Sequence, residues 1–277
     1  MQVIDDIKEL THLTRNWSNS KKIGFVPTMG ALHEGHLALV KQSIDSCDIT
    51  VVSIFVNPSQ FGPNEDYGRY PKTFENDYKE LVNLGVDYIF LPSAHQMYPE
   101  NYRTWVSIDE ITTTLCGASR PGHFTGVATI VLKLVNLVSP TLMFMGEKDF
   151  QQVVVLETML RDLNIETKII RCPIVRAETG LALSSRNRYL SAEEAKVAPE
   201  IYNSMVKAKA SFKSGIDNPQ GLIAELQASL EAKGMVIDYI QIVDSFSLQS
   251  VDLVTKGNRL IIAVILGKTR LIDNIEI

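Results

Sequence analysis

Two histidines lie three residues apart in the segment FVPTMGALHEGH, residues 25–36. This spacing places His33 and His36 on one side of a helical turn. The segment follows a strand-like run at 23–26 and leads into a helical pattern, so the histidines fall where a helix begins. A helix N-terminus offers N–H groups and a partial positive charge, and Gly35 lets a ligand approach the backbone closely. The arrangement favours the binding of a phosphate group.

Other interpretations of this segment are less favoured. A surface loop with two incidental histidines fits H-x-x-H in isolation, but the strand–loop–helix context counts against it. The zinc metalloprotease pattern needs histidines four residues apart. Here they are three apart, and the sequence offers no obvious third ligand. The turn also lacks the G-x-x-x-x-G-K-[ST] pattern, which disfavours a P-loop ATPase.

Two further polar segments carry groups suited to a nucleotide. GEKDFQQ follows a short apolar run, and its Lys148 could neutralise a phosphate as a point charge. Asp149 could cap the next helix or bind a ribose hydroxyl or a metal. LSSRNR, residues 183–188, combines adjacent hydroxyls with arginines, which suits a phosphate chain. A charged surface turn and an interdomain linker are the alternatives for these two segments.

Neutral polar groups follow the most apolar strand-like run. The motif VNPSQFG contains Asn57 and Gln60, which could fix a hydroxyl or a carboxylate. An ordinary loop would also explain it, because Asn-Pro is typical of turns. The Gly/Pro-rich loop SRPGHFTG contains Arg120 and His123. The sequence leaves open whether this loop reaches the site or lines a subunit contact.

The first two-thirds of the chain alternates between strand-like and helical patterns. Strands are predicted at 23–26, 50–56, 88–91, 142–145 and 166–171, and helices at 34–45, 74–84, 127–137 and 150–163. Such alternation predicts an α/β fold with a doubly wound parallel sheet. Ligands in these sheets bind at the carboxyl ends of the strands. The histidine segment, VNPSQFG and GEKDFQQ each follow such an end.

The pattern changes after about residue 172. Helices are predicted at 192–212 and 219–233, followed by strands at 239–244, 259–265 and 269–275. Helices followed by adjacent strands predict a smaller α+β domain with an antiparallel sheet. We therefore expect two domains, residues 1–175 and 176–277.

Composition limits the classes of partner. The 277 residues include 27 Lys and Arg against 32 Asp and Glu, a net charge of −5. This balance argues against a broad nucleic-acid surface but leaves small anions open as ligands. Three separated cysteines form no disulfide framework, and no apolar run approaches the roughly 20 residues of a membrane helix. The acidic start lacks the apolar core of a signal peptide. We expect a cytoplasmic protein that binds neither nucleic acid nor membranes.

Six segments together resemble the pantothenate synthetase family: PTMGALHEGH, VSIFVNPSQF, ASRPGHFTGV, GEKDFQQ, LALSSRNRYL and the terminal LIDN. Each is moderately specific, and six in the family's order are highly specific. The resemblance implies a Rossmann-like nucleotidyltransferase domain, a smaller C-terminal lid domain and a homodimer. It also implies a pantoate–β-alanine ligase that uses ATP and Mg²⁺ and forms pantothenate, AMP and pyrophosphate through a pantoyl adenylate.

The resemblance also implies roles for particular residues. His36 is the expected proton donor, and His33 and Lys148 are the other catalytic candidates. Gln60 would contact pantoate and β-alanine, and Gln152 would contact pantoate. The Ser-Ser-Arg stretch resembles the mobile KMSKS loop of related synthetases. The expected ATP-binding residues are Met29, Gly30, Ala31, Leu32, His33, Glu34, Gly35, His36, Gly146, Glu147, Lys148, Asp149, Val175, Leu183, Ser184, Ser185 and Arg186. The residues that hold Mg²⁺ stay open.

Two other functions remain as alternatives. A related nucleotidyltransferase would transfer AMP or CMP to a phosphorylated acceptor and share the histidine turn. The neutral side chains of Gln60 and Gln152 argue against a doubly charged acceptor. A non-catalytic nucleotide-binding or scaffold protein would keep the fold alone. The presence of both histidines, Lys148 and the Ser-Ser-Arg loop argues against that interpretation.

Overall fold

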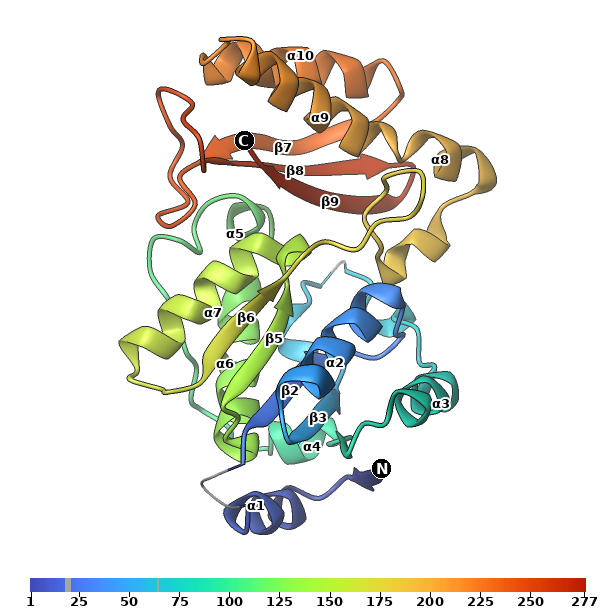
Figure 1. The fold of residues 1–277 in the computed structure, drawn as a ribbon, viewed down its shortest axis with the longest axis vertical. Coiled ribbons are helices and arrows are strands. Elements are labelled where there is room, and N and C mark those ends of the chain that lie inside the picture. The colour runs from blue at the N-terminus through green and yellow to red at the C-terminus, as the bar shows by residue number, and fades with distance from the viewer. Residues whose placement is uncertain (18–20, 64) are drawn as a thin grey trace. The chain divides into compact units, whose positions relative to one another are not determined.

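The computed structural model describes residues 1–17, 21–63 and 65–277 and separates into two compact units. Unit 1 comprises residues 1–109, 120–147 and 152–173, and unit 2 comprises residues 110–119, 148–151 and 174–277 (Figure 1). Two short segments from the first part of the chain, 110–119 and 148–151, therefore belong to the second unit. The predicted domains 1–175 and 176–277 stay a prediction.

Unit 1 is built on a six-stranded sheet with the order β1-β4-β3-β2-β5-β6. All neighbouring strands are parallel, so the predicted doubly wound sheet is confirmed. Because β2 lies between β3 and β5, the strand order reverses beside it, and ligands bind at such switch points. The strands are β1 (Gln2–Ile4), β2 (Ile23–Thr28), β3 (Ile49–Ile54), β4 (Tyr88–Phe90), β5 (Leu142–Gly146) and β6 (Lys168–Cys172).

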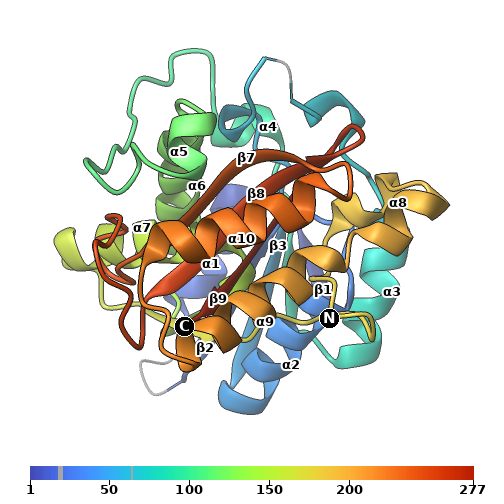
Figure 2. The same ribbon diagram turned by 90° about the horizontal axis from the view of Figure 1, so that it is seen from above.

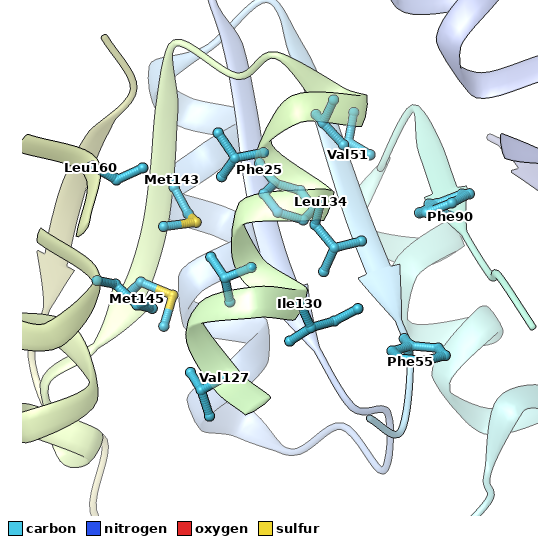
Figure 3. Packing of buried hydrophobic residues seen from close by; sticks show 14 of the residues in the cluster. Phe25, Val51, Phe55, Phe90, Val127, Ile130, Leu134, Met143, Met145 and Leu160 are labelled. Carbon is cyan, nitrogen blue, oxygen red and sulfur yellow. The ribbon is translucent and has the colours of Figure 1, made fainter. Parts of the chain in front are cut away.

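Helices cover both faces of this sheet. Successive side chains of a strand point to opposite faces, and here they enter different cores. Phe25 and Val51 pack with α1, α6 and α7, as Figure 3 shows for α6, whereas Val26 and Val52 pack with α2 and α3. This two-sided burial explains why the strands read as nearly continuous apolar runs. The helices are α1 (Ile7–Arg15), α2 (Glu34–Ser46), α3 (Phe74–Leu84), α4 (Ala94–Met97), α6 (His123–Val138) and α7 (Phe150–Asp162), whose first two residues belong to unit 2.

Helix α6 is the most apolar of these helices, and it is largely buried against the sheet. It is 16 residues long, shorter than the roughly 20 residues needed to cross a bilayer. Across the described part of the chain, no helix combines the length and hydropathy of a membrane span.

Unit 2 contains an antiparallel sheet of three strands, β7 (Val236–Val243), β8 (Arg259–Leu266) and β9 (Thr269–Glu276). Helices α9 (Glu200–Lys213) and α10 (Pro219–Glu231) lie side by side across one face of this sheet (Figure 2). Their buried residues, such as Met205 and Leu226, share one core with Ile262 of β8. The predicted antiparallel sheet of the C-terminal region is confirmed. The unit also contains α5 (Cys116–Ser119) and α8 (Ala192–Val197).

Two parts of the fold differ from the sequence prediction. The helix predicted over 192–212 is wrong as a single element, because the structure has α8 and α9 in its place. Pro199, the N-cap of α9, separates them, because proline lacks the N–H that would continue the helical hydrogen bonds. The sequence prediction also omitted β1, α1 and the short helices α4 and α5. Asp6 caps α1 by accepting hydrogen bonds from the Lys8 and Glu9 amides.

Candidate active site

The two histidines lie at the N-terminus of α2, directly after the central strand β2. His33 is the N-cap, and its Nδ1 accepts a hydrogen bond from the Gly35 amide at 3.1 Å. The His33 and His36 rings lie 4.1 Å apart between centroids, so the predicted placement on one turn is confirmed. Because Nδ1 of His33 is an acceptor, the neutral ring carries its proton on Nε2. His33 can therefore donate a hydrogen bond to an oxyanion through Nε2.

A buried carboxylate from α3 holds the turn that precedes these histidines. Asp77 accepts hydrogen bonds from the Ala31 amide at Oδ2 and the Leu32 amide at Oδ1, both at 2.9 Å. Thr73 donates its hydroxyl to Oδ1 at 3.1 Å. The Asp77 side chain is 3% exposed. Charge-assisted bonds of this kind are stronger than neutral ones, so Asp77 fixes the path of the backbone into α2.

The same turn has a backbone that only some residues tolerate. Gly30 and Ala31 both have positive φ, at 79° and 52°. A Cβ at Gly30 would lie 3.0 Å from Cγ2 of Ile54 and 3.1 Å from Oδ2 of Asp77. Glycine is therefore required at position 30 by both conformation and space. The left-handed geometry at Ala31 is maintained by its bond to Asp77.

Asn57 orients the side chain of Gln60, which follows strand β3. Asn57 is 1% exposed, and its Nδ2 donates to Oε1 of Gln60 at 3.0 Å and to the Gly126 carbonyl at 3.1 Å. The Tyr98 hydroxyl donates to Oδ1 of Asn57 at 2.8 Å. With Oε1 engaged, the amide of Gln60 directs Nε2 to within 3.1 Å of Sδ of Met29. Gln60 thus presents hydrogen-bond donors, which suits a carboxylate or hydroxyl oxygen.

Arg120 and His123, whose role the sequence left open, hold the backbone of Gln60. The Gln60 carbonyl lies 2.8 Å from Nδ1 of His123 and accepts from Nη2 of Arg120 at 3.3 Å. Nη1 of Arg120 lies 3.1 Å from Nε2 of His123. Arginine can only donate, so Nε2 accepts and Nδ1 carries the proton that binds the carbonyl. The SRPGHFTG loop therefore supports the Gln60 segment.

Glu65 completes this group by pairing with Arg120. The Arg120 Nε donates to Oε1 of Glu65 at 2.7 Å, and a second nitrogen reaches Oε2. Burial alone would raise the pKa of Glu65, but the hydrogen bonds and charge of Arg120 outweigh burial and lower that pKa. The pair anchors the chain that follows Gln60.

In unit 2, the Val175 and Leu183 segments pair, and Ser184 begins a short helix. The Leu183 amide donates to the Val175 carbonyl at 3.0 Å. Ser184 is the N-cap of the 3₁₀ helix Ser185–Tyr189, and its Oγ accepts from the Arg186 amide at 3.3 Å. The predicted nucleotide-binding residues at 175 and 183–186 therefore belong to one continuous structure.

The remaining predicted residues divide between the units. Gly146 and Glu147 lie in unit 1 at the end of β5, and Gln152 lies half-buried near the start of α7. Lys148 and Asp149 lie in unit 2, where Nζ and Oδ2 are 3.8 Å apart. Within unit 1 the structure brings His33 next to His36 and Gln60 next to Met29. The functional roles of all these residues stay predictions.

Asp77 is the main residue of the histidine turn that sequence reasoning missed. The sequence does contain a clue to Asp77. It lies four residues before Leu81, on the apolar side of an amphipathic helix, and both residues are buried in α3. A carboxylate is rarely buried without partners. Such a position could have been flagged, although its partners at 31 and 32 could not have been identified.

A doubly wound parallel sheet with two histidines at the helix N-terminus after its central strand defines the class of the protein. It is an α/β protein with a site suited to an anion at the switch point of the sheet. The model of the family described as pantoate–β-alanine ligase matches residues 2–276. The chain belongs to this family, whose members are also named pantothenate synthetases.

Individual relatives agree with this assignment. The pantothenate synthetase of Thermosipho africanus is 50% identical over 278 residues, covering 100% of both chains. That of Sulfurihydrogenibium sp. is 53% identical over 92% of each chain. The crystal structure of pantothenate synthetase from Thermus thermophilus matches with a TM-score of 0.94 at 41% identity, covering 100% of this chain and 99% of the other. The Francisella tularensis ligase, described as complexed with β,γ-ATP and β-alanine, matches with a TM-score of 0.85 at 38% identity, covering 100% and 97%.

Proposed function

We propose that this chain condenses pantoate with β-alanine at the expense of ATP, forming pantothenate, AMP and pyrophosphate through a pantoyl adenylate. Membership of the pantoate–β-alanine ligase family supports the overall reaction. The Francisella relative, described with an ATP compound and β-alanine, supports the use of both ligands. The observation that carries the proposal is the pair of adjacent histidines at the start of α2, directly after a turn whose backbone amides bind Asp77.

Adenylation solves a leaving-group problem. An amine cannot displace oxide from a carboxylate at neutral pH, whereas AMP is a good leaving group. A carboxylate oxygen of pantoate attacks the α-phosphorus of ATP, the bond to the β-phosphate oxygen breaks, and pyrophosphate leaves. The β-alanine amine then attacks the acyl carbon, loses a proton and expels AMP.

The chain contributes positioning and charge stabilisation to the first step. Negative charge grows on the phosphate oxygens as the carboxylate attacks. Nε2–H of His33 donates a hydrogen bond to this charge, and His36, the proposed proton donor, donates a hydrogen bond to a phosphate oxygen. The N-terminal dipole of α2 adds to the effect. Asp77 holds the backbone turn at Ala31 and Leu32, directly before the first histidine, so the start of α2 is positioned before the reaction.

Cations and backbone groups hold the nucleotide. Lys148 neutralises the triphosphate with the compact charge of its ammonium group. Arg186 does so with its planar guanidinium, which can donate two parallel hydrogen bonds. The backbone around Gly30 and Gly35 permits close approach of phosphate to the N–H groups of the turn. Gly146, Glu147, Asp149, Val175, Leu183, Ser184 and Ser185 are the other proposed ATP contacts.

Pantoate is held by neutral groups for a physical reason. A cation beside its carboxylate would stabilise the ground state and reduce the nucleophilicity of the attacking oxygen. Gln60 and Gln152 would bind the carboxylate without that penalty. Asn57 engages Oε1 of Gln60, so the donor end of Gln60 is directed toward Met29. A doubly charged acceptor would be poorly served by two uncharged amides, which counts against the alternative nucleotidyltransferase.

Mg²⁺ fits the site as a companion of ATP. Within the described residues, no group of three or more His, Cys, Asp or Glu side chains is arranged to hold a metal. Mg²⁺ commonly binds through substrate phosphates with one or two carboxylates rather than in an all-protein cage. When bound, it would neutralise charge on the triphosphate, and Asp149, whose Oδ2 lies 3.8 Å from Nζ of Lys148, is a candidate carboxylate ligand.

The remaining expectations rest on the family resemblance. We propose that domain 1–175 binds nucleotide and pantoate, that domain 176–277 is the lid domain, and that the protein is a cytoplasmic homodimer. Sedimentation velocity tests the proposed dimer. The expected particle has twice the 30.9 kDa mass of the chain. A purely monomeric particle at micromolar concentration would refute it.

Product identification tests the central proposal. The protein is incubated with ATP, Mg²⁺ and pantoate, with and without β-alanine, and products are separated by mass spectrometry. A bound pantoyl adenylate without β-alanine, and pantothenate with it, are expected. Formation of ADP, or of a dinucleotide independent of β-alanine, would reject the proposal.

A further inference from the structure

The terminal motif LIDN, residues 271–274, has no role in the chemistry above. Its last two residues lie in β9, close to the end of the chain. Asp273 is 3% exposed and Asn274 is 1% exposed. Oδ1 of Asp273 also accepts from the Asn274 amide at 2.7 Å, which links the two residues. Buried polar side chains in a sheet require partners, and those partners indicate what the motif does.

Asn274 binds the backbone of Lys148. Its Nδ2 donates to the Lys148 carbonyl at 3.0 Å, across 126 positions of sequence. Both residues belong to unit 2. The bond fixes the peptide from which the Lys148 side chain extends. Because this bond is to the backbone carbonyl, it positions Lys148 and does not engage the ammonium group of its side chain.

Asp273 binds Arg176 through two parallel hydrogen bonds. Nη1 donates to Oδ2 at 2.6 Å and Nη2 donates to Oδ1 at 2.8 Å. The guanidinium also donates to the Gly180 carbonyl at 3.1 Å and stacks 3.8 Å from the ring centroid of Tyr202. A bidentate pair with a stacked face fixes the arginine in both position and plane.

Arg176 in turn organises the turn that carries Val175 and Leu183. It forms an antiparallel bridge with Ala182, and the Leu183 amide donates to the Val175 carbonyl. At Gly180, where φ is +92°, a Cβ would lie 2.7 Å from the Tyr202 ring. Contacts therefore hold the turn both at its tip, where Gly180 lies against Tyr202, and at its base, where Leu183 binds Val175. Ser184 and Arg186 follow directly from it.

We infer that Asp273 and Asn274 are positioning residues for the nucleotide-binding segments of unit 2. Asn274 sets the backbone of Lys148, and Asp273 acts through Arg176 on the segment 175–186. The inference rests on the proposed ATP-binding role of these segments. It assigns to the C-terminal strand a part in nucleotide affinity, although neither side chain touches the nucleotide.

Substitution of Asn274 tests the inference. Asn274→Ala removes the donor, and Asn274→Asp replaces it with an oxygen that faces the Lys148 carbonyl. The KM for ATP should rise about tenfold in Asn274→Ala, which is the change in affinity that the loss of one hydrogen bond produces. It should rise further in Asn274→Asp. The KM for pantoate should stay within about twofold. Calorimetric titration with ATP should show the same loss.

Asn258→Ala is the matched control. Asn258 is also buried in unit 2, and its Oδ1 accepts from the amide and hydroxyl of Thr255. This variant loses buried hydrogen bonds without changing Lys148 or Arg176. It should lower the thermal midpoint and leave the KM for ATP unchanged. An equal rise in the KM for ATP in Asn274→Ala and Asn258→Ala would show a general structural effect and overturn the inference.

A milder variant covers the case in which Asn274 variants do not fold. Arg176→Lys keeps the charge opposite Asp273 but loses the fork and the stacked face. A selective rise in the KM for ATP supports the inference, and wild-type constants in any folded variant overturn it. The wild-type assay separates the two proposals. Pantothenate formation by the wild type with unchanged Asn274 variants rejects this inference alone, whereas a wild type that forms no adenylate rejects the proposed function.

Discussion

A buried aspartate holds the candidate site segments in each unit, but by different means. In unit 1, Asp77 binds the amides of Ala31 and Leu32 directly. In unit 2, Asp273 binds the guanidinium of Arg176, which then holds the Gly180 carbonyl. Both carboxylates are 3% exposed. One is a clamp on a single turn, and the other is an ion pair that supports a whole hairpin.

The difference has energetic consequences. Removing a carboxylate that binds amides leaves neutral N–H groups without an acceptor, which a turn can relieve by small movement. Removing one that binds a buried guanidinium leaves an uncompensated charge. Unit 1 should therefore lose the geometry of its turn when its aspartate is changed, whereas unit 2 should lose stability.

The largest expected effect is that of Asp273→Ala. Breaking a buried ion pair by removing one partner typically costs about 3–5 kcal/mol. The free energy of unfolding, measured by urea denaturation, should fall by that amount. A loss below about 1 kcal/mol is typical of an exposed ion pair. It would show that Arg176 becomes hydrated in the variant, and the two units would then not differ in how they depend on their buried aspartates.

His33→Asn separates the capping role of this residue from its chemistry. Asparagine is a good N-cap, so the stability of α2 should be retained. Adenylation should slow by about 10²–10³-fold, because the Nε2 donor is lost. Pyrophosphate release with ATP and pantoate measures this rate. His33→Ala should lose about 1 kcal/mol of stability as well. A normal rate in His33→Asn would exclude His33 from catalysis.

Asp77→Asn tests the clamp on the histidine turn. The amide keeps one acceptor but places an NH₂ group against the other backbone N–H. We expect a loss of about 1–3 kcal/mol in unfolding free energy and a lower kcat. Asp77→Ala should reproduce both effects. Wild-type kcat in both variants would mean that the turn keeps its shape without Asp77.

Glu65→Gln should have the smallest effect, below about 1 kcal/mol, because the pair with Arg120 is partly exposed. The lowered pKa of Glu65 means that its contribution is complete above the unfolded carboxyl pKa of about 4.3. It is lost as the pH falls through the lower folded pKa. Stability measured against pH should fall less steeply in acid for Glu65→Gln. Identical acid limbs would contradict the assignment.

The arrangement of the histidine turn could be predicted from the sequence because its residues are neighbours in the chain. The strand, the turn and the two histidines lie within residues 23–36, and local periodicity predicts their arrangement. The residues that hold them are distant: Asp77 lies 46 positions from Ala31, and Asn274 lies 126 positions from Lys148. Such pairings depend on tertiary packing, which local patterns do not encode. The break before Pro199 was visible in the sequence but was outweighed by the helical pattern on either side.

Transfer of isotopic oxygen from pantoate to AMP reports directly on the proposed adenylation step. If the histidine turn promotes attack of the pantoate carboxylate on the α-phosphorus, one carboxylate oxygen must end in AMP. Pantoate labelled with ¹⁸O in its carboxylate is incubated with ATP, Mg²⁺ and β-alanine, and AMP is analysed by mass spectrometry. AMP should carry one ¹⁸O atom, and His33→Asn should form this labelled AMP far more slowly. Unlabelled AMP, or label in phosphate with formation of ADP, would contradict it.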